Sequence, residues 1–156
     1  MSDTIRTSRL DGRQLVVDTR HGTEVYDHRF LAAALLIFVS RGSGTIEPEE
    51  SAAMIELIRE HFDLEVAESL GLLTRAMTEI AEDPNLGPEL AKLGQSLAES
   101  EKEEIAIMAL KVIAADGKRE FEEMEQFNTA LEAIGATPET IHQAFDRYFA
   151  ETMPDS

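Results

Sequence analysis

A chain of 156 residues with 43% apolar side chains is long enough to form one domain around a hydrophobic core. It contains no cysteine, which excludes disulfides, thiolate metal sites and cysteine nucleophiles. Its formal net charge of −17 disfavours binding to nucleic acid and to anionic lipid. We therefore expect no nucleic-acid partner, and instead a cation or a protein partner with a basic surface. A general solubilising role for the acidic surface is the simpler alternative.

The sequence also predicts where the protein resides. Its first 11 residues are polar and contain no apolar stretch typical of a signal peptide. The longest apolar run, residues 30–39, is far shorter than the roughly 20 residues that span a bilayer. We therefore expect a cytoplasmic protein without an integral membrane segment.

Residues 1–27 differ from the rest of the chain and are predicted to form an N-terminal arm. They are rich in Thr, Arg, Asp and Gly, and a glycine follows both Asp11 and His21, as is typical of turns. The β-branched segment 14–18 predicts a short strand or an extended stretch. Because a lone strand is unstable, this arm must pack on the rest of the protein or stay mobile.

Two helices are predicted after the arm. Segment 30–40 is apolar on nearly every side, which favours a buried helix, and its alanine triplet supports that assignment. Asp27 is suited to cap this helix, and Gly42 and Gly44 predict its end. A second helix is expected to begin at Pro48, because proline suits the first helical position. Its apolar residues are Met54, Ile55, Leu57, Ile58 and Phe62.

Five more helices are predicted in the remainder of the chain. The third covers 64–81, where apolar residues recur in steps of three and four: Val66, Ala67, Leu70, Leu73, Met77 and Ile80. A shorter helix follows at 89–97. The fifth is expected to be capped by Ser100, with Glu103 completing a capping box, and to continue to Ala115.

The last two helices meet at Gly135, which is expected to end the sixth, while Thr137 is expected to cap the seventh. We therefore predict an all-α fold of about seven helices and almost no sheet. The helical domain would cover 28–152, and 153–156 would form a C-terminal tail.

The chain contains an internal repeat with a shift of 73 residues. Each half has an apolar helix, a glycine turn and an acidic helix start. The matching pairs are Gly44 and Gly117, Glu47 and Glu120, Glu50 and Glu123, Met54 and Phe127, and Ile58 and Leu131. Both glycines lie where a helix must end and the chain reverse. The fold is thus predicted to consist of two duplicated helical hairpins around one core.

The acids around the second turn are candidates for holding a cation. A glutamate six residues after a glycine resembles an EF-hand loop, but Val112 and Ala114 occupy two of the positions that would supply oxygen ligands, so an EF-hand is excluded. Asp116, Glu120 and Glu123 can still converge on a hard divalent cation that keeps some of its water. Alternatively, the aspartate only forms the turn and the glutamates complement a helix N-terminus.

The sequence contains no motif that predicts catalysis. No two of the four histidines are spaced to bind a metal from one helix, and the position of His61 is explained by a helix end. Phosphate-binding loops, dinucleotide fingerprints and nucleophile elbows are absent from the sequence. We therefore expect no enzymatic activity.

The second repeat resembles the tellurite-resistance TerB family. The resemblance lies in residues 110–117, an apolar helix that ends in Ala-Asp-Gly, and in Glu122 and Glu123 after it. It covers about 28–152, and the first repeat departs from it because Ser43 stands where the family commonly has aspartate. It implies a cytoplasmic bacterial protein of tellurite or metal stress. It also implies divalent-cation association through acidic residues, and relatives that serve as modules beside co-chaperone domains.

Three functional hypotheses follow. The first is a metal-stress module whose acidic face associates with a divalent cation or a stress-response complex. The second is a protein-interaction adaptor without a metal. The third is a metal-assisted hydrolase that would use Asp116 and Glu123.

Overall fold

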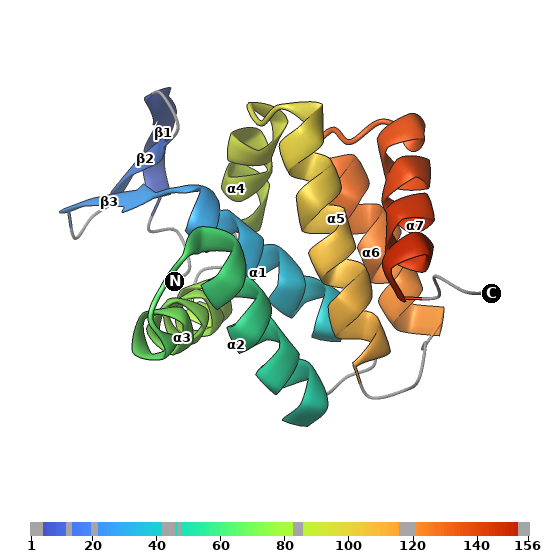
Figure 1. The fold of residues 1–156 in the computed structure, drawn as a ribbon. Coiled ribbons are helices and arrows are strands. Elements are labelled where there is room, and N and C mark those ends of the chain that lie inside the picture. The colour runs from blue at the N-terminus through green and yellow to red at the C-terminus, as the bar shows by residue number, and fades with distance from the viewer. Residues whose placement is uncertain are drawn as a thin grey trace.

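The computed structural model describes residues 5–11, 14–19, 22–41, 46, 48–82, 86–115 and 121–152. Within them lie three strands and seven helices (Figure 1). The strands are β1 (Ile5–Asp11), β2 (Gln14–Thr19) and β3 (Gly22–Tyr26). The helices are α1 (His28–Ser40), α2 (Pro48–Phe62), α3 (Val66–Glu82), α4 (Leu86–Gln95), α5 (Glu99–Ala114), α6 (Phe121–Ala133) and α7 (Pro138–Thr152). The predicted all-α domain of seven helices is confirmed, whereas the N-terminal arm forms a small sheet in place of one short strand.

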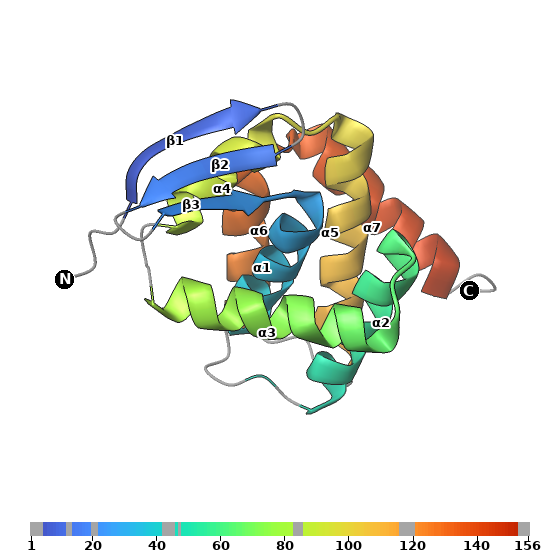
Figure 2. The same cartoon turned by 90° about the vertical axis from the view of Figure 1, so that its left-hand side faces the viewer.

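The three strands form an antiparallel sheet in the order β1-β2-β3. On the central strand, Leu15 pairs with Leu10 on one side and Tyr26 on the other. Leu15, Val17 and Tyr26 are buried, and the sheet lies over α4 and the start of α1 (Figure 2). Because its inner face packs on helices, the arm is part of the folded domain.

A polar and aromatic contact joins the sheet to α3. The Tyr26 hydroxyl donates a hydrogen bond to Glu79 Oε1 at 2.6 Å. Burial raises the pKa of Tyr26 well above its usual range, and the neighbouring Glu79 carboxylate adds to this shift. The Arg75 guanidinium lies 5.1 Å from the ring centre of Tyr26 and 4.8 Å from that of Phe30. This arginine also pairs with Glu79 and, at 3.5 Å, with Glu24. The sheet is therefore held by both apolar packing and charge.

The two most deeply buried helices, α1 and α5, form the centre of the protein (Figure 1). Every residue of α1 from Phe30 to Ile37 is buried, as are Val39 and Ser40. Phe38 is the exception, with 40% of its surface exposed. Burial on nearly every side explains why the α1 sequence shows no polar face.

Local signals at three helix ends are confirmed. Asp27 accepts hydrogen bonds from the backbone amides of Arg29 and Phe30, both at 3.1 Å. The Thr137 hydroxyl accepts one from the amide of Thr140 at the start of α7. Gly135 has a φ of +79°, which ends the last turn of α6 in the left-handed region that glycine tolerates.

The predicted cap of α5 is wrong. This helix begins at Glu99, so Ser100 lies inside its first turn. The cap position is Ala98, whose amide donates to Glu101 Oε1 at 3.2 Å. Glu101 therefore takes the part predicted for Glu103, and no side-chain hydroxyl caps this helix.

A buried lysine locks the start of α5 to the turn between α6 and α7. Lys102 is 5% exposed, and its ammonium donates to Glu99 Oε2 at 3.0 Å and to the Gly135 carbonyl at 3.2 Å. The Thr140 hydroxyl donates to Glu99 Oε1 at 2.6 Å. The hydrogen bonds from Thr140 and then Lys102 lower the pKa of Glu99 to about 2.

We expect Glu99→Gln to lower the melting temperature at pH 7 and to reduce the loss of stability in acid. The Glu99 pKa is about 2 in the folded protein against an ordinary 4.5, so the carboxylate stabilises the fold above about pH 4.5. That contribution is lost as the pH falls towards 2. Thermal melts should therefore show the wild type and the variant converging at low pH. The matched variant Glu139→Gln, at an exposed acid of α7, should show no such convergence; parallel curves for Glu99→Gln would contradict the prediction.

The duplication extends beyond the predicted hairpins. A shift of 73 residues moves the start of α2 onto residue 121, where α6 begins. The same shift moves the start of α3 onto residue 139, next to the first residue of α7, Pro138. Just as α1 packs on α3, α5 packs on α7. Each half therefore contains three helices, and α4 connects the halves.

The apolar face predicted for the third helix is only partly covered. Leu73 and Ala76 are buried, but Val66, Leu70 and Met77 are 56%, 50% and 42% exposed. Steps of four and seven residues bring these three side chains to one side of α3. This helix thus presents an apolar strip at the surface.

Candidate functional site

Two glutamates at matching positions of the duplicated halves are fully buried. Glu50 lies in the first turn of α2 and is 0% exposed, and Glu123 lies in the first turn of α6 and is 1% exposed. Both helices begin at the lower end of the molecule in Figure 1. The repeat has therefore placed a buried carboxylate at each of two helix starts at the same end of the fold.

Burial of a carboxylate has a large energetic cost unless charge or hydrogen bonds compensate it. The position at a helix start supplies part of that compensation, because backbone amides and the helix dipole favour negative charge there. Carboxylate oxygens in such a setting are also the ligands that hard divalent cations prefer. The chemistry of both positions therefore suits cation binding as well as helix capping.

Of the three residues predicted to hold a cation, only Glu123 lies within the described residues. Asp116 and Glu120 lie outside them, as do the turn glycines Gly44 and Gly117. Within the described ranges, no group of three or more His, Asp or Glu side chains is arranged to hold a metal. The internal repeat matches Glu50 with Glu123, although the predicted cation site does not include Glu50.

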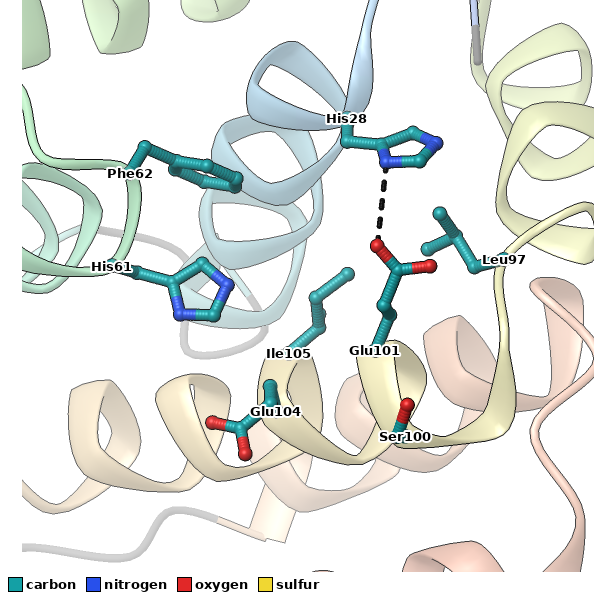
Figure 3. A pocket seen from close by; sticks show the side chains of 8 residues that line it. All are labelled: His28, His61, Phe62, Leu97, Ser100, Glu101, Glu104 and Ile105. Atoms are coloured by element: carbon teal, nitrogen blue, oxygen red, sulfur yellow. Dashed lines mark ion pairs between the residues drawn. The ribbon is translucent and has the colours of Figure 1, made fainter. Parts of the chain in front are cut away.

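A second polar site lies at the other end of α2, in a pocket of about 240 Å³ (Figure 3). His28 at the start of α1 and His61 near the end of α2 line it, together with Glu101 and Glu104 of α5. His28 Nδ1 is 3.6 Å from Glu101 Oε2. Figure 3 shows Glu101 on the side of His28 and Glu104 on the side of His61.

This pocket brings together imidazoles that the sequence separates by 33 positions. The spacing of histidines along one helix could not reveal it, because His28 and His61 belong to different helices. The imidazole of His61 also packs edge-on against Phe62, with ring centres 4.7 Å apart. The contact between His28 and Glu101 joins the start of α1 to the first part of α5.

The fold is thus a duplicated, mostly helical domain with a small N-terminal sheet and a buried glutamate in the first turn of both α2 and α6. The sequence pattern described as Tellurite resistance protein TerB matches residues 29–146. Because this match covers most of the chain, the protein belongs to the TerB family, which confirms the resemblance found at residues 110–117. No curated protein and no solved structure matches the chain. Within the described part of the chain, every helix is too short or too polar to cross a membrane.

Proposed function

We propose that this protein is a non-enzymatic module of the tellurite-resistance type that associates with a divalent cation at its acidic hairpin turns. The observation that carries the proposal is the burial of Glu50 and Glu123 at matching positions of the two halves. A surface glutamate that only complements a helix dipole has no need of burial. Two buried ones, kept in both halves, suggest a shared chemical role.

The second hairpin is the better cation site. Asp116 precedes the turn glycine, and Glu120 and Glu123 are spaced three residues apart, so their carboxylates are close enough in sequence to share one ion. In the first repeat, Ser43 replaces the aspartate and removes one charged ligand. Oxygen ligands of this kind favour Ca²⁺, Mg²⁺ or Mn²⁺ over softer metals.

The charge of the whole chain supports the same function. A net charge of −17 raises the local concentration of cations around the protein and disfavours anionic partners. An ion at the second turn would join the end of α5 to the start of α6. We propose that cation loading stabilises this end of the domain, through which the module takes part in a cytoplasmic metal-stress complex.

Titration with Ca²⁺, Mg²⁺, Mn²⁺ and Zn²⁺ should raise the melting temperature of the wild type for at least one of the three hard ions. The expected gain is about 2.7 kcal/mol when the ion is present at 100 times its dissociation constant. Asp116→Asn/Glu123→Gln should abolish this gain. The matched control Glu125→Gln/Glu132→Gln removes the same charge from exposed positions of α6 and should retain it.

Two outcomes would contradict cation binding. One is the absence of a stabilising ion, and the other is an equal gain in the wild type and in the double variant at Asp116 and Glu123. The function then favoured is an adaptor without a metal, for which the exposed apolar strip of Val66, Leu70 and Met77 on α3 is the supporting observation.

A further inference from the structure

An apolar cavity of about 550 Å³ opens between α1, α3, α4 and α6. Of the twelve residues that line it, Thr129 is the only polar one. The cavity is open to solvent, because Phe38, Pro88 and Ala133 of its lining are exposed. A hollow this apolar leaves much hydrophobic surface in contact with water, which is a feature of binding sites.

Four alanines make the cavity hollow. Ala34 comes from α1, Ala91 from α4, and Ala130 and Ala133 from α6. Each alanine side chain ends at its Cβ, so these positions on α1, α4 and α6 contribute no side chain long enough to occupy the space. Phe38 borders the same space and is 40% exposed, which leaves apolar surface in contact with water.

The size and the lining of the cavity define the chemistry of an occupant. The volume lies within the range of roughly 300–1,000 Å³ that is typical of small-molecule sites. A lining without charged groups offers no partner to an ionised ligand. Binding of a hydrocarbon is favourable, because it removes apolar surface of both the cavity and the ligand from water. A small apolar molecule fits both features.

The single polar group indicates how such a molecule would lie. Thr129 is exposed on α6, so its hydroxyl can exchange a hydrogen bond with a ligand hydroxyl or carbonyl near the surface. Glu125 and Glu132 are four residues before and three residues after it, on the same side of the helix. Their negative charge disfavours a carboxylate or phosphate at that end of the cavity.

We propose that this alanine-lined cavity binds the hydrocarbon part of a small uncharged amphiphile, whose polar end lies at Thr129. The occupant is a molecule with an aliphatic or aromatic body and a hydroxyl or carbonyl group. This binding is independent of the cation site, because no predicted cation ligand lines the cavity.

The test uses the uncharged fluorophore N-phenyl-naphthylamine, whose emission rises in an apolar environment. The wild type should bind it saturably with one site per chain. Ala133→Trp on α6 and Ala91→Trp on α4 each add an indole to the cavity lining, and each should weaken binding at least about tenfold. Asn128→Trp adds the same indole to α6 beside the cavity lining and should leave the affinity within about twofold. A cooperative melt shows that each variant is folded.

Competition identifies the preferred head group. Decanol should displace the fluorophore at a concentration at least about tenfold below that of decanoate, which has the same chain length and an ionised end. Equal displacement by the two would overturn the assignment of an uncharged ligand.

Three results would overturn binding of a small molecule altogether. The first is fluorescence that does not saturate, and the second is unchanged affinity in both Ala133→Trp and Ala91→Trp. The third is a dimer in sedimentation that Ala133→Trp dissociates and that takes up no fluorophore, which would assign the cavity to a contact between two copies.

Discussion

Phe127→Ala is expected to lower the free energy of unfolding by about 3–5 kcal/mol, the usual cost of removing a buried aromatic ring. Phe127 is 0% exposed and is among the largest fully buried side chains of the core. Its ring centre lies 5.6 Å from that of Phe145 on α7, at an angle of 70°. The substitution therefore removes both buried apolar area and a favourable edge-to-face contact.

The loss is large because the whole stability of a domain is only about 5–15 kcal/mol. Phe127 also lies one turn after Glu123 on the same side of α6, so the ring helps to fix the helix that carries the buried carboxylate. Urea unfolding followed by circular dichroism measures the effect. Phe149→Ala on α7 is the comparison: its ring is only partly buried, and it should cost clearly less. A loss below about 1 kcal/mol for Phe127→Ala would show that α6 does not pack as described.

The sequence predicted the helices well where the deciding interactions are local. Asp27 and Thr137 cap their helices by accepting hydrogen bonds from amides three residues further along the chain. Gly135 ends α6 because glycine tolerates a positive φ. None of these signals depends on residues that are distant in the sequence. Ser100 failed as a cap because the start of α5 is also fixed from a distance. Glu99 must reach Thr140, 41 residues away, and its position in the first turn allows that contact.

The small sheet could not be predicted for a related reason. Strand pairing is stable only when a face of the sheet is covered, and here α4 and the start of α1 provide the cover. The sequence showed the β-branched segment at 14–18, but not the surface on which Leu15 and Val17 would pack. In the same way, periodicity found an apolar face on α3 without revealing that Leu70 would stay exposed.

The candidate site was predicted in part. The repeat identified Glu123 and matched it with Glu50, because spacing is visible in a sequence. It could not show that both carboxylates are buried, since the chain has 31 acids and most acids lie at the surface. The pocket at His28 and His61 was missed because only tertiary packing joins the two helices.

Gly94→Ala is expected to destabilise the protein by about 1–3 kcal/mol, although alanine is the better helix former. A Cβ at Gly94 would collide with Ile134 Cγ2 and lie 2.6 Å from Ile134 Cβ. Ile134 is 2% exposed, and its β-branched side chain has no room to turn away. The added methyl must therefore push α4 away from the end of α6.

Gly71→Ala is the matched control and should have the opposite sign. Gly71 lies inside α3, and a Cβ there would meet no atom within 4 Å. The free energy of unfolding of this variant should be higher than that of the wild type by about 0.5–1 kcal/mol, because alanine loses less backbone entropy than glycine when the helix forms. Urea unfolding of both variants measures the difference, and equal effects would contradict the close approach of α4 to Ile134. Because Ile134 also lines the alanine-lined cavity, Gly94→Ala should in addition weaken fluorophore binding, whereas Gly71→Ala should leave it unchanged.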